Sequence, residues 1–294
     1  MITRREILCL VCERWLAANF LFVLALAVAC PAQEAAKVAR ADGTETPLRV
    51  FRPASEGTEG CAPLALISPG AGGTENGYAY LAEGLRDRGW LAIVMGHKES
   101  GPGKLIGEVT SSGIHGGLVE MVTDPALHRD RLMDVAAALA WAEKQCRRPY
   151  KALLGHSMGT DTVMFEAGAD NKLGVHGEDR FDAYVTISPS GPGSIFPEHA
   201  WSKIRKPLYV LTGTEDKGLQ GPWEWRTRPY DDLPAGCKWL GVIGGASHLN
   251  FAGIGFARKT KQLTIDSVSA FLTDARNGNC SAPPVEAGMQ LKSK

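Results

Sequence analysis

A serine flanked by two glycines, in Gly155-His156-Ser157-Met158-Gly159, follows a short apolar segment. That segment, 151–156, is typical of a buried strand, and the residues after Ser157 have the composition of a helix. A G-x-S-x-G sequence between a strand and a helix presents the serine hydroxyl on a sharp, exposed turn, where it can act as a nucleophile. The alternative is a glycine-rich turn that happens to contain a serine. The rest of the chain must therefore supply a base, an acid and oxyanion donors.

Two other strand ends offer the base and the acid. His248 follows the apolar segment 238–245, and Asp216 follows another such segment, with Glu215 as the alternative carboxylate. Because ligands bind beyond the carboxyl ends of parallel strands, we expect Ser157, Asp216 and His248 to meet at one edge of a sheet. The histidine would take the serine proton, and the carboxylate would orient the histidine. The alternative is that these are solvated loop residues.

Backbone N–H groups for an oxyanion are available in two places. Met158 directly follows the serine, at the start of the predicted helix. The other place is the glycine-rich stretch 69–73, after an apolar segment; Ala71 is the predicted donor there and Gly70 is the alternative. A plain glycine-rich turn would explain the same residues.

Two segments can form walls of a substrate pocket. Residues 97–126 are rich in glycine and predict a long irregular loop, which contains His115. The segment 218–234, between the acid and the base, contains Trp223 and Trp225. These aromatic residues can line an acyl or aromatic site, or they can pack the loop against the rest of the protein. The sequence leaves both readings open.

Predicted strands and helices alternate from about residue 35 to a final amphipathic helix over 257–276. This order predicts an α/β fold, with a mostly parallel central sheet and helices on both faces. We expect one catalytic domain over 31–280 and a flexible tail over 281–294.

Composition excludes several classes of protein. The net charge is +0 and 44% of the residues are hydrophobic, so a nucleic-acid-binding protein is not expected and a large core is. We find no His and Cys spacing typical of a metal site, and no dinucleotide-binding or P-loop sequence. The sequence therefore predicts neither a metal nor a cofactor.

The first thirty residues are typical of a secretory signal. Arg4, Arg5 and Arg14 precede the apolar run 20–29, which is too short for a comfortable membrane span. We therefore expect residues 1–30 to be a signal peptide and the protein to be exported, either periplasmic or secreted. An uncleaved anchor is the alternative, and Cys30 lies in a weak lipobox that would allow a lipid anchor.

Taken together, the sequences SPGAGG, GHSMG, TGTED and GASHLNF resemble the α/β-hydrolase superfamily, in its dienelactone-hydrolase-like and secreted, cutinase-like esterase branches. The resemblance covers roughly residues 40–277. It implies a serine hydrolase that cleaves carboxylic esters, small or lipid-like, through an acyl-enzyme. The serine in place of the cysteine of dienelactone hydrolases speaks against that substrate. The absence of a tryptophan after 182–189, where cutinase-like polyesterases carry one, speaks against polymers.

The resemblance also implies that four cysteines lie in two close pairs at the edge of the sheet opposite the site. It predicts the disulfides Cys61–Cys146 and Cys237–Cys280, with free thiols as the alternative. Other activities remain open: cleavage of amides, thioesters or polyesters, acyl transfer to an alcohol, or a catalytically silent binding protein.

Overall fold

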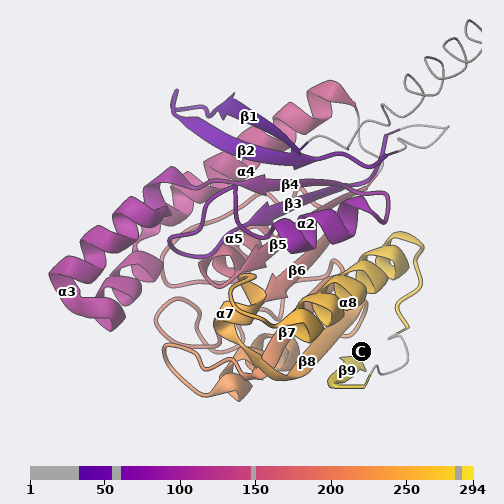
Figure 1. Ribbon diagram of the computed structural model, residues 1–294. Helices are drawn as coiled ribbons and strands as arrows, with labels where there is room; N and C mark the ends of the chain where they lie inside the picture. The colour runs from indigo at the N-terminus through magenta and orange to yellow at the C-terminus, as the bar shows by residue number, and fades with distance from the viewer. Residues whose placement is uncertain (1–32, 55–60, 147–149, 282–286) are drawn as a thin grey trace, which may run out of the picture. The chain divides into compact units, whose positions relative to one another are not determined.

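Short apolar segments form the strands of a single sheet (Figure 1). The computed structural model describes residues 33–54, 61–146, 150–281 and 287–294, so the predicted signal segment and Cys30 lie outside the described residues. Within the described part, the sheet has nine strands in the order β1-β2-β4-β3-β5-β6-β7-β8-β9. Their bounds are β1 Gln33–Ala39, β2 Glu45–Phe51, β3 Leu64–Ser68, β4 Leu91–Met95, β5 Lys151–His156, β6 Ala183–Ile187, β7 Leu208–Glu215, β8 Lys238–Ser247 and β9 Met289–Ser293.

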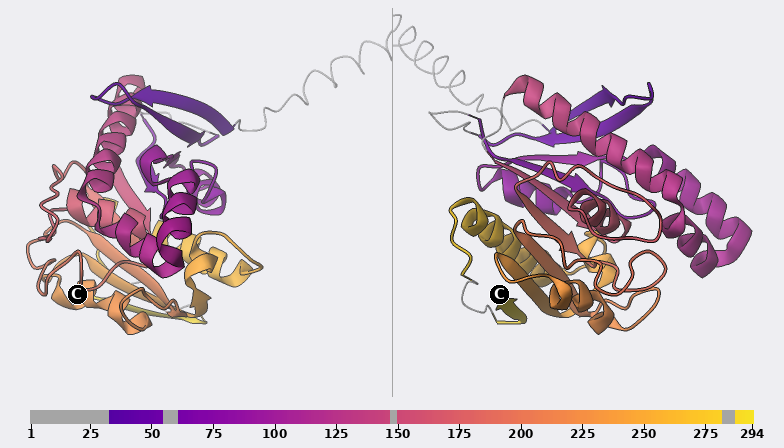
Figure 2. Two further views of the ribbon diagram at one scale, coloured as in Figure 1. Left: turned by 90° about the vertical axis from the view of Figure 1, so that its left-hand side faces the viewer. Right: turned by 180° about the vertical axis from the view of Figure 1, so that it is seen from behind.

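Helices cover both faces of this sheet, as the alternating pattern predicts. Figure 1 shows α2 and α8 on the near face, and the view from behind in Figure 2 shows α4 and α5 on the other. The helices are α2 Ala79–Arg86, α3 Pro102–Thr123, α4 Pro125–Gln145, α5 Met158–Glu166, α6 Arg228–Asp232, α7 His248–Phe251 and α8 Arg258–Arg276, and the 3-10 helices are η1 Lys98–Ser100 and η2 Trp223–Thr227. None of the described helices is both long enough and apolar enough to cross a membrane.

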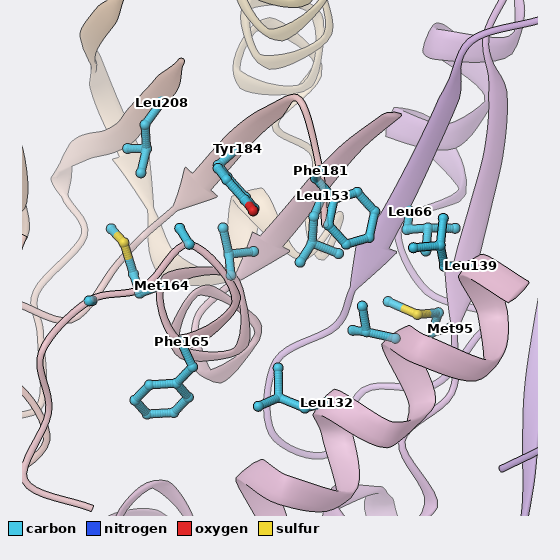
Figure 3. Packing of buried hydrophobic residues seen from close by; sticks show 14 of the residues in the cluster. Leu66, Met95, Leu132, Leu139, Leu153, Met164, Phe165, Phe181, Tyr184 and Leu208 are labelled. Carbon is cyan, nitrogen blue, oxygen red and sulfur yellow. The ribbon is translucent and has the colours of Figure 1, made fainter. Parts of the chain in front are cut away.

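Each face of the sheet has its own core. On one face, side chains of α4 and α5 such as Leu139 and Phe165 pack against strand residues such as Leu66 and Leu153 (Figure 3). On the other face, α2 and α8 bury residues that include Phe271. Because both faces are covered, β3, β4, β5 and β6 are buried along their whole length or nearly so, which explains their continuous apolar runs.

Six adjacent strands, β4, β3, β5, β6, β7 and β8, run parallel to one another. Their carboxyl ends therefore meet at one edge. Helices and loops that follow those ends carry the residues that the sequence singles out for chemistry.

The segment 97–126 is helical, which corrects the prediction of an irregular loop. It contains η1, all of α3 and the start of α4. At Gly113 the φ angle is 72°, and the chain turns back there, so α3 is a hairpin of two helical segments. A side chain at Gly117 would collide with the backbone of Glu108, which shows how closely the two segments pack. The glycines that favour a loop in the sequence are thus the ones that allow this close approach.

The end of the chain is a strand, which corrects the prediction of a flexible tail over 281–294. Met289–Ser293 form β9, antiparallel to β8, and Met289 is buried opposite Ile243. The strand covers what would otherwise be the open edge of the sheet at β8, and the edge supplies the backbone hydrogen bonds that order this segment.

Both expected disulfides are present. Cys61 pairs with Cys146, and Cys237 pairs with Cys280. The first joins the segment before β3 to the end of α4, and the second joins the start of β8 to the residues after α8. Both lie at the amino ends of the strands that they adjoin, away from the edge described above.

Candidate active site

Ser157 occupies a sharp turn between β5 and α5. Its backbone angles are φ 54° and ψ −126°, a conformation that a residue with a side chain rarely adopts. A side chain at Gly155 would collide with the carbonyl of Gly159, and one at Gly159 with the carbonyl of Ser68. Only glycine fits at both positions, so the spacing of the G-x-S-x-G sequence follows from the packing of this turn.

Ser157, His248 and Asp216 form a continuous hydrogen-bonded chain. The Oγ atom of Ser157 lies 2.9 Å from Nε2 of His248, and Nδ1 of the histidine lies 2.9 Å from Oδ1 of Asp216. His248 is the first residue of α7, directly after β8, and Asp216 directly follows β7. Glu215, the alternative acid, is exposed. The structure thus brings together the three residues that the sequence singled out.

Asp216 is buried and accepts several hydrogen bonds. Thr212 donates its hydroxyl to Oδ2 at 2.9 Å, and the guanidinium of Arg226 lies 3.0 Å from Oδ1. Burial alone would raise the pKa of this carboxyl, but the bond from His248 and the charge of Arg226 outweigh it and hold the pKa below its ordinary value. Asp216 therefore stays ionised at neutral pH and can orient the imidazole.

Arg226 belongs to this site, although the sequence analysis did not select it. Its side chain is buried and donates to the carbonyls of Asp216, Ser188 and Lys217 at 2.9, 2.7 and 3.1 Å. It thereby ties the loop after β6 to the loop after β7. Its Nη2 also lies 3.2 Å from Nδ1 of His248. An arginine directly after the second of two tryptophans, in the segment that joins acid and base, is the sequence feature that could have pointed to it.

The loop after β3 packs against Ser157. A side chain at Gly70 would come within 3.0 Å of Cβ of Ser157. In this loop Gly70 N–H donates to the hydroxyl of Tyr78 at 3.2 Å, Gly72 N–H to the carbonyl of Ser100 at 2.8 Å, and Gly73 N–H back to Gly70 at 3.0 Å.

Ala71 N–H, by contrast, donates to no acceptor in the part of the chain that the structure describes, and neither does Met158 N–H at the start of α5. The two residues approach each other, because Ala71 packs against a small cluster that contains Met158. Two unused backbone donors therefore flank the serine, while the alternative donor Gly70 is already bonded.

Tyr78 and His156 form a second layer beneath the serine. The hydroxyl of Tyr78 lies 2.7 Å from Nδ1 of His156, and the rings of His156 and His248 are 4.6 Å apart between centroids. Burial holds the pKa of His156 well below its ordinary value, so the ring is neutral.

A hollow lies between α3, the loop after β6 and the segment that leads into η2. Its walls include Val119, Val122, Ser190, Ile195, Leu219 and Trp225. Val122 also packs against the cluster around Met158 and Ala71, which links this hollow to the two free N–H groups. Its mostly apolar walls suit an apolar group.

The three remaining residues predicted to line the pocket lie in three different places in the structure. Trp225 lines the hollow, and its indole N–H donates to the carbonyl of Pro192 at 2.8 Å. Side chains at Gly218 or Gly221 would collide with its ring, so the wall is tightly packed. Trp223 instead packs against the core cluster on the α4 and α5 face. His115 is exposed on α3, near the turn at Gly113.

Comparison with known proteins supports the fold. No family model and no curated protein sequence matches the chain. The similar solved structures include Est1E from Butyrivibrio proteoclasticus and a PEG-bound cold-adapted esterase from an Arctic intertidal metagenomic library. The first is 15% identical, covers 83% of this chain and 99% of its own, and has a TM-score of 0.55. The second is 19% identical, covers 81% and 92%, and has a TM-score of 0.53.

These identities are low, and what they establish is a shared fold. The mostly parallel centre of the sheet, with helices on both faces, is consistent with that fold. The chain has the α/β-hydrolase fold.

Proposed function

We propose that this protein is a serine hydrolase that cleaves carboxylic esters through an acyl-enzyme. The observation that carries the proposal is the chain of hydrogen bonds from Ser157 through His248 to the ionised Asp216. At its serine end, this chain of hydrogen bonds lies beside the backbone N–H groups of Ala71 and Met158, which donate to no acceptor in the described residues. A nucleophile, a base, an orienting acid and an oxyanion site are the four parts that acyl transfer to serine needs.

The reaction begins with proton transfer. His248 keeps the proton on Nδ1, directed to Asp216, so its Nε2 can accept the proton of Ser157 as Oγ attacks the ester carbonyl. The carbonyl oxygen becomes an oxyanion and accepts hydrogen bonds from the N–H groups of Ala71 and Met158. The imidazolium then gives its proton to the departing alkoxide, and the alcohol leaves.

Deacylation repeats these steps with water. His248 takes a proton from water, whose oxygen attacks the acyl carbon, and the same two N–H groups stabilise the second oxyanion. The proton returns to Ser157 Oγ as the acid leaves. Asp216 stays ionised throughout and stabilises the imidazolium that forms at each attack.

Esters are the preferred substrate class for two reasons. The two similar structures named above are esterases, at identities that leave the substrate of this chain open. In addition, the hollow lined by Trp225 and Val122 has mostly apolar walls, which suit an apolar group of a substrate. We propose that it receives a short apolar acyl group.

Export is part of the proposal. The two disulfides are typical of a protein that matures in an oxidising compartment. The predicted signal peptide over 1–30 and the lipid anchor at Cys30 remain predictions from the sequence. Labelling of cells with a radioactive fatty acid tests the anchor, because only a lipidated Cys30 incorporates the label.

A fluorophosphonate probe and a panel of p-nitrophenyl esters test the activity. We expect the probe to label the wild type and not Ser157→Ala, and we expect acetate and butyrate esters to be cleaved faster than long-chain esters. Labelling without ester cleavage would redirect the proposal to amides, thioesters or acyl transfer. Absence of labelling in the folded wild type would mean a catalytically silent protein.

A further inference from the structure

The loop that carries Ala71 is bonded to a buried arginine side chain that also contacts two other elements. We propose that Arg131 of α4 is a positioning residue, which fixes this loop against helix α5 and thereby fixes the spacing of the Ala71 and Met158 N–H groups. The inference rests on the proposed ester hydrolysis, since it concerns the same oxyanion site. It assigns a function to a residue that touches neither the serine nor the histidine.

The guanidinium of Arg131 contacts three separate elements. Its Nε donates to the hydroxyl of Thr162 on α5 at 2.8 Å, and its Nη1 to the hydroxyl of Ser100 in η1 at 2.6 Å. Its Nη2 donates to the hydroxyl of Ser68 at 3.0 Å and to the carbonyl of Pro69. Only 1% of Arg131 is exposed, so water cannot replace these bonds.

These contacts enclose Ala71 on both sides along the chain. Pro69, two residues before it, accepts directly from Arg131. Gly72, the residue after it, donates its N–H to the carbonyl of Ser100, whose hydroxyl also accepts from Arg131. The same guanidinium reaches the first turns of α5, the helix that Met158 begins. The rigid, planar guanidinium of Arg131 therefore fixes the positions of both segments that carry the oxyanion donors.

A second Ser–His–Asp arrangement anchors this end of the network. Ser68 Oγ lies 2.9 Å from Nε2 of His97, and Nδ1 of His97 lies 2.8 Å from Oδ2 of Asp134. Burial lowers the pKa of His97 to about 4, so the ring is neutral at pH 7. Donors then run in one direction, from Arg131 to Ser68, from Ser68 to His97 and from His97 to Asp134.

This arrangement resembles the candidate active site in distances but differs in access. Ser68 is 0% exposed and His97 2%, so a substrate cannot reach them. The Ser68 oxygen also accepts from Arg131, which opposes its use as a nucleophile. The role of the three residues is to satisfy Arg131 and to balance its charge with the buried carboxylate of Asp134.

Removal of the guanidinium leaves buried acceptors without donors on both the loop and α5. We therefore expect Arg131→Met to change the geometry of the oxyanion site while the serine, base and acid keep theirs. Misplaced groups of this kind cost rate rather than substrate affinity. We expect kcat per active site to fall about 10- to 100-fold, with KM for a short-chain ester changed less than about threefold.

The matched control is Arg180→Met. Arg180 also binds α5, through the buried carboxylate of Glu166 at the other end of the helix, at 2.8 and 2.7 Å. This variant should lose stability and keep kcat per active site, where sites are counted by fluorophosphonate titration. Arg131→Lys keeps the positive charge without the planar fork, and we expect its kcat to lie between those of the wild type and Arg131→Met.

Two further readouts separate positioning from general loss of structure. The affinity of a trifluoromethyl ketone, which forms an oxyanion on the serine, should fall in proportion to kcat/KM in the Arg131 variants and stay unchanged in Arg180→Met. Hydrogen exchange at Gly72 N–H should accelerate only in the Arg131 variants. Unchanged kcat per titrated site in Arg131→Met would overturn the inference, and so would unchanged exchange at Gly72.

The outcome is distinguishable from failure of the proposed function. If the wild type cleaves no ester, the proposed function fails, and exchange at Gly72 together with the fluorophosphonate labelling rate still decides the role of Arg131. If the wild type is active and both Arg131→Met and Arg180→Met lose the same fraction of kcat, the positioning role is refuted while the ester hydrolysis stands.

Discussion

The side chains of Arg226 and Asp216 form a buried ion pair, with Nε of the arginine 3.0 Å from Oδ1 of the aspartate. The same nitrogen also donates to the Asp216 carbonyl, so the arginine holds both the side chain and the backbone of this residue. Since the Oδ1 atom also faces His248, the carboxylate is shared between a permanent cation and the imidazole. The loop geometry around the acid thus depends on a residue ten positions further along the chain.

We expect Arg226→Met to destabilise the protein strongly, because it leaves a buried carboxylate without its cation. Loss of one partner of a buried pair costs about 3–5 kcal/mol of unfolding free energy. Arg228→Met is the control: Arg228 forms an exposed pair with Glu198, and such pairs contribute about 0–1 kcal/mol. Urea unfolding of the two variants measures the difference. Equal losses of unfolding free energy in the two variants would show that the buried ion pair contributes no more to stability than the exposed one.

Variants of two adjacent residues, Asp216 and Glu215, test which carboxylate orients the histidine. Asp216→Asn should lower kcat by about 10⁴-fold, because an amide no longer fixes the imidazole tautomer that accepts the serine proton. Glu215→Gln should leave kcat unchanged, since Glu215 is exposed. The rates are measured with a short-chain p-nitrophenyl ester after a circular dichroism check of folding. A large loss in Glu215→Gln alone would assign the acid to Glu215.

The proposed acyl pocket predicts a change in chain-length preference. Val122→Phe places a larger side chain into the hollow beside Trp225, and should lower kcat/KM for butyrate relative to acetate esters by about tenfold. Ile106→Phe is the control, since Ile106 is 66% exposed on the same helix. If the butyrate-to-acetate ratio is the same in both variants, the acyl group binds elsewhere.

Most of the fold and the central chemistry could be predicted from local sequence. The strands β3 to β8 are continuous apolar runs, and the parallel order brings their ends together, so residues directly after those ends were identifiable without knowledge of loop geometry. Ser157, Asp216 and His248 each directly follow a strand. Their proximity is a consequence of topology, and topology follows from the alternation of strands and helices.

The residues that support the site were harder to predict, because their partners depend on tertiary packing. Arg131 lies in a charged stretch at the start of α4, where a solvated helix face is the ordinary interpretation. The packing of α5, η1 and the loop after β3 buries it. Tyr78 binds Gly70 and His156 from the residue before α2, where its backbone is left-handed, with φ 57°. The strand at 289–293 was detectable, since Met289 and Leu291 alternate with polar residues.

The two disulfides predict separate losses of stability. Replacement of Cys61 and Cys146 by alanine opens a loop of 85 residues, and replacement of Cys237 and Cys280 opens one of 43. The chain-entropy relation gives about 4–5 kcal/mol for the first and about 4 kcal/mol for the second. Urea unfolding of each double variant measures these losses. Titration of four free thiols in the unreduced, unfolded wild type would contradict both bridges.

The stability of the protein should fall between pH 6.5 and about pH 4, because three buried histidines stay neutral in the folded state. Burial lowers the pKa of His97 and of His128 from 6.5 to about 4, and holds that of His156 well below 6.5. As the pH falls through 6.5, the unfolded chain binds protons that the folded chain does not, so folding becomes less favourable.

Asp161 of α5 acts in the opposite direction. Burial raises the pKa of its carboxyl from 3.8 to about 7, so the folded protein gains this proton at a higher pH than the unfolded chain. As the pH falls over the same range, protonation of Asp161 therefore stabilises the folded state, while the depressed pKa of each histidine destabilises it. The net difference of about two protons gives a loss of roughly 3 kcal/mol per pH unit between pH 6 and pH 5.

Urea unfolding at pH 7, 6 and 5 measures this slope, and Asp161→Asn is the matched variant. Asparagine cannot take up the compensating proton, so the slope should steepen to about three protons, or roughly 4 kcal/mol per pH unit. At pH 8 the same variant should be more stable than the wild type, since it removes a buried charge that burial disfavours. A stability that is constant from pH 7 to pH 5 would contradict the neutral state of the three histidines, and an unchanged slope in Asp161→Asn would contradict the raised pKa of that carboxyl.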